Sequence, residues 1–111
     1  NKKAKGDKML KISTEFRKGV LFVRLLGQIE NDKYLESINN LVEYVGIKFV
    51  VLNIENIKKI DVNNISDILK YNNKIKQDKR HLLICDANKR SSIFEDKISK
   101  INCEIDAFNF I

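Results

Sequence analysis

The sequence predicts an α/β domain in which a mixed sheet of four to five strands packs against about three helices. Three observations support this fold class. Short apolar runs rich in valine, isoleucine and leucine recur along the chain, as is typical of buried strands. The segments between the later runs carry apolar residues at helical spacing. Strands that alternate with helices need crossover connections, which are right-handed in nearly all known proteins and pair strands in parallel.

The first two apolar runs predict a β-hairpin. Residues 10–16, "LKISTEF", alternate apolar and polar side chains. Residues 17–19, "RKG", supply a turn, with a glycine available for positive φ. Residues 20–29 are apolar almost throughout, Arg24 excepted, which indicates a strand in the middle of the sheet.

The first helix is predicted in "NDKYLESINNLVEYVG". Its apolar residues form one stripe at helical spacing: Leu35, Ile38, Leu41, Val42 and Val45. Asn31 or Asp32 can accept the free amides at its start, and Gly46 can adopt the left-handed conformation at its end. Such a helix must pack its stripe on a sheet face, because it is too short to be stable alone.

Two further buried strands are predicted at residues 48–54 and 81–86, and the helix between them begins near Asp61. The apolar face of that helix comprises Ile65, Ile68, Leu69 and Ile75. A weaker helix is predicted over residues 88–101, with Ile93, Ile98 and Ile101 facing inward. A last strand is predicted over residues 104–108. The element order is therefore β-β-α-β-α-β-α-β.

At 111 residues the chain has the length of a single domain. Residues 1–8, with four lysines and one aspartate, are expected to be a disordered basic extension, and residues 9–111 the domain, with Met9 a candidate natural start. No run approaches the ~18 apolar residues of a membrane span. Cys85 sits in an apolar run and Cys103 is isolated from it, so a reduced, cytoplasmic protein is expected.

The net charge of +6 raises the question of nucleic-acid binding. Beyond the basic extension, lysine and glutamate are interspersed, without the stripe of arginine and aromatic residues that follows a phosphate backbone. The charge therefore indicates a solvated surface with a mild positive bias. Nucleic acid is not expected as a partner.

Four segments resemble the STAS domain, the class that includes bacterial anti-sigma factor antagonists, over residues 10–110. "GVLFVRLLGQIE" is similar to the second strand of that family, which ends in glycine, any residue, leucine or isoleucine, and then an acid. "FVVLNIENIKKID" is similar to its central strand, "DVNNISDIL" to its switch loop at a helix start, and "HLLICDAN" to its fourth strand and the following loop.

The resemblance implies a regulatory switch whose phosphorylated residue is absent here. In the family, the serine directly after the aspartate is phosphorylated by an anti-sigma factor that is also a kinase, and only the unphosphorylated antagonist binds it. Asp61 matches the aspartate, but Val62 stands at the serine position. Asn63 and Asn64 stand where the second hydroxyl residue and the glycine would be, and Ile65 matches the apolar position.

Valine has no oxygen nucleophile, so Val62 cannot accept a phosphoryl group. We therefore expect a contact surface that stays uncharged and binds its partner without control by phosphorylation at this loop. Ser66, one turn further on, is more simply explained as a polar-face serine, and Ser91 and Ser92 as capping or solvated residues.

The resemblance implies a protein partner, either an anti-sigma factor or a related GHKL-type serine kinase, and a role in transcription regulation. The expected partner-binding residues are Glu30, Asn31, Asp61, Val62, Asn63, Asn64, Ile65 and Ser66. Capping by Asp61 or Asn63 would also explain this loop, and is compatible with docking. A scaffold subunit stays open as an alternative, as do a weak homodimer and a nucleotide site at Asn63, Asn64 and Lys89.

Catalysis is not expected. The single histidine, His81, lies four residues from Cys85 on one predicted strand, so the two would be about 13 Å apart along it, too far for a nucleophile and its base. The sequence contains no Gly-rich phosphate loop and no Cys/His spacing typical of a metal site. No cofactor is expected.

Overall fold

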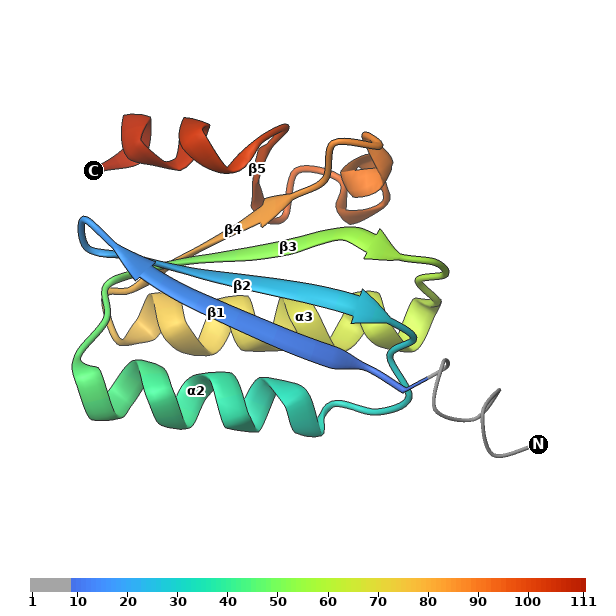
Figure 1. The fold of residues 1–111 in the computed structure, drawn as a ribbon, viewed down its shortest axis with the longest axis horizontal. Coiled ribbons are helices and arrows are strands. Elements are labelled where there is room, and N and C mark those ends of the chain that lie inside the picture. Colours follow the sequence, from blue (N-terminus) through green and yellow to red (C-terminus); the bar gives the residue numbers. More distant parts are fainter. Residues whose placement is uncertain (1–8) are drawn as a thin grey trace.

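The computed structural model describes residues 9–111, and the expected basic extension, residues 1–8, lies outside this range. The sheet has five strands in the order β1-β2-β3-β4-β5 (Figure 1). Their bounds are β1 Lys11–Arg17, β2 Val20–Gly27, β3 Phe49–Ile57, β4 His81–Cys85 and β5 Ser99–Ile101. β1 and β2 are antiparallel, and all later neighbours are parallel. The predicted fold class is confirmed.

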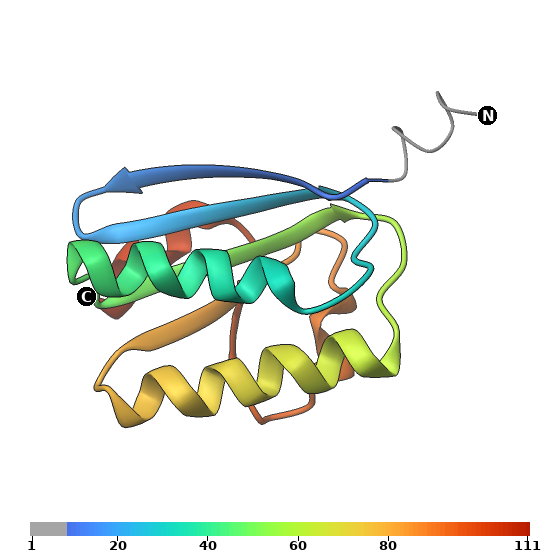
Figure 2. The same cartoon turned by 90° about the horizontal axis from the view of Figure 1, so that it is seen from below.

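Two long helices, α2 (Lys33–Val45) and α3 (Val62–Gln77), cover the same face of the sheet (Figures 1 and 2). The main core lies between them and the strands, with Val42, Ile68 and Ile75 among its fully buried side chains. Gly46 ends α2 in the predicted left-handed conformation, with φ of 79°. Because both helices follow parallel strands, both begin at the same end of the sheet, where the carboxyl ends of β2 and β3 lie.

A shorter segment, the 3₁₀ helix η2 (Glu104–Phe110), covers the opposite face (Figure 1). Its Ala107 joins a second cluster of buried residues from the sheet, and its Phe108 packs edge-on against Phe22 with ring centroids 5.7 Å apart. The predicted strand over residues 104–108 is therefore wrong. The fifth strand lies earlier, at Ser99–Ile101, where it gains backbone pairing with β4.

The predicted helix over residues 88–101 is also wrong. Within that range only Arg90–Phe94 is helical, as a single 3₁₀ segment, η1. It ends at Glu95, whose positive φ of 54° is incompatible with a continuing right-handed helix. Phe94 is fully buried, whereas Ile93, which the sequence pattern placed inward, is 41% exposed. Tertiary contacts of Phe94 have overridden a weak helical periodicity here.

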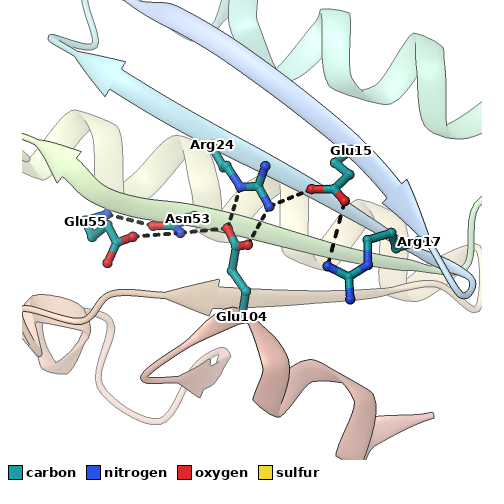
Figure 3. A network of polar contacts seen from close by, with 6 residues as sticks. All are labelled: Glu15, Arg17, Arg24, Asn53, Glu55 and Glu104. Carbon is teal, nitrogen blue, oxygen red and sulfur yellow. Dashed lines mark hydrogen bonds and ion pairs between the residues drawn. The ribbon is translucent and has the colours of Figure 1, made fainter.

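A polar network fastens η2 to the sheet (Figure 3). The Glu104 carboxylate accepts hydrogen bonds from Nε and Nη2 of Arg24, at 2.9 and 2.7 Å, and from Nδ2 of Asn53 at 2.8 Å. Arg24 Nη2 also donates to Glu15 at 2.8 Å. The hydrogen bonds from Arg24 lower the pKa of Glu104, and those from Arg24 to Glu104 and Glu15 raise the pKa of Arg24.

This network predicts a pH dependence of stability. Because the pKa of Glu104 is lower in the folded state, its contribution is present above the ordinary carboxyl pKa and is lost as the pH falls through the lowered value. Glu104→Gln is expected to lower the thermal midpoint at neutral pH and to flatten its decline on acidification, as measured by circular dichroism. Glu95→Gln, at an exposed surface ion pair, is the control. An acid profile of Glu104→Gln identical to that of the wild type would contradict the assignment.

Candidate functional site

The start of α3 is fixed by a reciprocal pair of hydrogen bonds. Asp61 is the N-cap, and its Oδ1 accepts from the backbone N–H of Asn64 at 2.8 Å. Asn64 Oδ1 in turn accepts from the backbone N–H of Asp61 at 3.0 Å. This capping box satisfies two amides that a helix start otherwise leaves free. The predicted capping role of Asp61 is therefore confirmed, and the first turn is held in one conformation.

Asn64 differs from its expected place at the contact surface. It is a helical residue at the third position, 5% exposed, and its amide group is engaged in the cap. Nor is Asn63 the cap, since it lies inside the first turn. Ile65 and Ser66 are half-buried, and Ile65 packs against the main core. These inward residues support the turn, and they leave Asp61, Val62 and Asn63 as its exposed part.

Val62 is the first residue of α3, and 79% of its surface is exposed. It is flanked by the exposed side chains of Asp61 and Asn63. No side chain from residue 61 to residue 65 carries a hydroxyl group. The tip of this turn therefore presents a small apolar side chain at the positive end of a helix, without an acceptor for a phosphoryl group.

The loop after β2 lies at the same end of the sheet as the start of α3. The backbone N–H of Lys58, directly after β3, donates to the carbonyl of Gly27, the last residue of β2, at 3.3 Å, so the two connections start side by side. Glu30 and Asn31 are both exposed, and Asn31 Oδ1 accepts from the backbone N–H of Lys33. Within residues 9–111, no hydrogen bond or ion pair joins Glu30 to residues 61–66. Glu30 thus lies at the predicted end of the sheet, but within the described residues it makes no hydrogen bond or ion pair with the start of α3.

Sequence reasoning missed the Asp86–Arg90 pair, which joins the carboxyl ends of β3 and β4. Asp86 directly follows β4 and is fully buried, and its Oδ2 accepts from Nε of Arg90 at 3.0 Å. The other guanidinium nitrogens of Arg90 donate to the carbonyls of Ile57 at 2.6 Å and Ile54 at 2.7 Å. Arg90 therefore ties the loop after β4 to the end of β3, from which the chain continues to Asp61. An acid after an apolar strand, with an arginine four residues later, was the available signal.

The structure gives little support to catalysis by Cys85 and His81 or to a metal site. Cys85 is 1% exposed, and burial raises the pKa of its thiol to about 12. His81 is exposed and stacks on Phe49, with ring centroids 5.1 Å apart. Among the described residues, no three metal-ligating side chains gather at one place. The absence of enzymatic activity stays a prediction.

No helix within residues 9–111 is long and apolar enough to cross a bilayer.

Solved structures with the same fold include anti-sigma factor antagonists. One, from Mycobacterium paratuberculosis, has a TM-score of 0.73 at 14% identity, covering 94% of this chain and 95% of its own. Another, SpoIIAA in its unphosphorylated form, has a TM-score of 0.70 at 11% identity, covering 93% of this chain and 100% of its own. An uncharacterised Shewanella loihica protein with a SpoIIAA-like fold has a TM-score of 0.53 at 13% identity, covering 91% and 92%. No protein-family model matches the sequence.

The chain therefore has the fold of the anti-sigma factor antagonists. This confirms the STAS fold that the four sequence segments imply. At these identities the similarity is one of fold, and the functional argument depends on the residues at the start of α3.

Proposed function

We propose that this protein is a cytoplasmic bacterial regulator of the STAS type, which binds an anti-sigma factor or a related GHKL-type serine kinase. The contact is the first turn of α3, and phosphorylation at that turn does not control it. The observation that carries the proposal is the 79% exposure of Val62 directly after the N-cap Asp61. This is the place at which the family that the sequence resembles carries its phosphorylated serine.

The physical argument concerns what a phosphate would change. A phosphoserine adds nearly two negative charges, and the positive end of a helix accommodates them without unfolding. Its effect on binding would therefore come from repulsion or steric exclusion of the partner. Val62 cannot acquire this charge, and the capping box keeps the turn in one conformation. The surface is fixed in the state that corresponds to an unphosphorylated antagonist.

An assembly subunit is the second candidate. The missing hydroxyl suits it equally well, since a structural contact needs no switch. In that case the same first turn binds a scaffold protein without kinase activity. Titrating the protein with a purified anti-sigma factor kinase and with a purified scaffold protein would separate the two candidates, because each candidate predicts binding to only one of them.

We expect Val62→Asp to weaken binding to an anti-sigma factor kinase of the source organism by at least about tenfold, because it places a fixed negative charge at the contact. Isothermal titration calorimetry measures the effect. The fold should be unchanged, since an acid is tolerated in the first turn of a helix. Ile105→Asp, at an apolar residue of η2 that is 70% exposed, is the matched control. Equal affinities of wild type and Val62→Asp would contradict docking through this turn.

A serine variant tests the switch directly. After incubation with the kinase and ATP, intact-mass analysis should show no phosphate on residues 61–65 of the wild type. Val62→Ser should accept one phosphate, and its phosphorylated form should bind more weakly than its unphosphorylated form. If the wild type binds no such kinase at all, the proposed partner class is wrong, whatever the two variants do.

A further inference from the structure

The strand β1 is an open edge of the sheet with apolar side chains left exposed. It is seven residues long, and six of them are exposed. Ile12 and Phe16 are 41% and 54% exposed, and they pair with Leu25 and Leu21 of β2, which belong to the main core. Within residues 9–111, no strand lies on the outer side of β1. An edge strand of this length, with unpaired backbone groups and exposed apolar side chains, is a template for pairing with another strand.

The neighbouring flank of α2 has the same character. Leu35 and Asn39 line the groove between α2 and α3, so Leu41 and Val45 lie, by helical periodicity, on the other flank, toward β1. Val45 is 50% exposed and the adjacent Tyr44 is 91% exposed. This flank comprises Lys33, Ser37, Leu41 and Val45, spaced four residues apart, and the adjacent Tyr44, so Lys33 at the start of the helix is its one charged residue. From Ser37 onward this helix flank is uncharged and continues the apolar face of the edge strand.

We propose that this edge binds a second copy of the chain, with the two β1 strands antiparallel about a two-fold axis at Ser13. A two-fold axis normal to the sheet pairs residues of the same face, so only registers centred on a residue are allowed. Centring on Ser13 places Lys11 opposite Glu15 of the second copy, twice by symmetry. Centring on Thr14 instead opposes Lys11 with Arg17, and centring on Glu15 opposes the two glutamates. Centring on Ile12 or Phe16 would pair only about three residues of β1, so among the longer registers charge complementarity selects Ser13.

The same register brings an apolar side chain to a hollow that can receive it. Leu10 comes opposite Phe16 of the second copy, on the face that carries α2. Leu10 borders a hollow of about 190 Å³ with Met9, Glu30, Asn31 and Tyr34. The Phe16 ring of the second copy would reach this hollow beside Leu10. Pairing of the two β1 strands at the usual spacing of ~4.8 Å would also place the β1-side flanks of the two α2 helices next to each other across the axis.

The test measures the association of the full chain by analytical ultracentrifugation over a wide concentration range. We expect the wild type to form dimers, and Lys11→Glu and Glu15→Lys each to raise the dissociation constant at least about tenfold by opposing like charges. An equimolar mixture of these two variants should recover dimers, because each then meets the opposite charge. This recovery is the decisive readout, since a folding defect from loss of the Glu15–Arg24 contact would not restore association.

Ile12→Lys provides a second disruptive variant that leaves the Glu15 contacts intact, and Ile105→Lys on η2 is its matched control. We expect Ile12→Lys to remain monomeric and Ile105→Lys to dimerise as the wild type does. A wild type that stays monomeric at all concentrations would overturn the proposal. So would tighter dimers of Lys11→Glu, which would indicate the Thr14 register. Amides of β1 that are protected from hydrogen exchange in a monomer would equally overturn it, since another segment would then cover the edge.

Discussion

Replacing Arg90 with methionine is expected to lower the free energy of unfolding by about 3 kcal/mol, at the lower end of the range for breaking a buried charge pair. The reason is the carboxylate of Asp86, which is fully buried and faces Arg90 at 3.0 Å. Methionine fills a similar volume but leaves this charge with only its two backbone donors, the N–H groups of Asn88 and Arg90. It also removes the donors to the carbonyls of Ile54 and Ile57. Chemical denaturation monitored by circular dichroism measures the loss.

Three comparisons sharpen this experiment. Arg90→Lys keeps the charge without the planar fork, so an intermediate loss is expected. Arg17→Met, at an arginine whose side chain is 53% exposed, should stay within about 0.5 kcal/mol of the wild type. Combining Arg90→Met with Asp86→Asn should cost less than the two single changes added together, because the shared interaction is lost only once. If Arg90→Met leaves the free energy of unfolding nearly unchanged, water or another group satisfies Asp86, and the pair does not hold the ends of β3 and β4 together.

The same pair is expected to matter for the proposed contact surface. Arg90 fixes the last residues of β3, and the chain reaches Asp61 four residues after Ile57. A loosened β3 end would let the capped turn move relative to the sheet. Arg90→Met should therefore weaken partner binding less than Val62→Asp does, through position and not through charge.

Much of the architecture could be predicted because its signals are local. A glycine that adopts the left-handed conformation at position 46 and an aspartate that caps α3 at position 61 act through their own backbone neighbours. The central strands were predictable because continuous apolar runs such as β3 can only be buried on both faces. The exposure of Val62 followed from its place at a helix start after a strand.

The parts that sequence could not give depend on contacts distant in the chain. β5 is a strand because β4 offers it hydrogen bonds, not because three residues have a strong preference. Residues 104–110 form a 3₁₀ helix where Glu104 meets Arg24, 80 positions away. Asn64 is expected at the contact surface because it stands at the glycine position of the switch loop that the sequence resembles. The usual capping box has glutamate or glutamine at the third helical position, so asparagine there gives little signal of the reciprocal bond.

Phe94→Ala is expected to lower the free energy of unfolding by about 3–5 kcal/mol, the range for truncating a buried phenylalanine. Its side chain is fully buried in the main core, and it anchors η1 there. Ile93→Ala, next to it, should cost well under 1 kcal/mol, because Ile93 is 41% exposed. Equilibrium denaturation of both variants provides the comparison.

The pair discriminates between the two accounts of residues 88–101. A regular helix with Ile93, Ile98 and Ile101 inward would bury Phe94 as well, since Phe94 lies four residues before Ile98, and truncation of either Ile93 or Phe94 would then be costly. In the observed 3₁₀ turn Phe94 enters the core and Ile93 stays 41% exposed, so only Phe94→Ala should be costly. A larger loss for Ile93→Ala than for Phe94→Ala would therefore contradict the structure of this segment. A costly Phe94→Ala beside a nearly neutral Ile93→Ala is the result that the observed burial of the two side chains predicts.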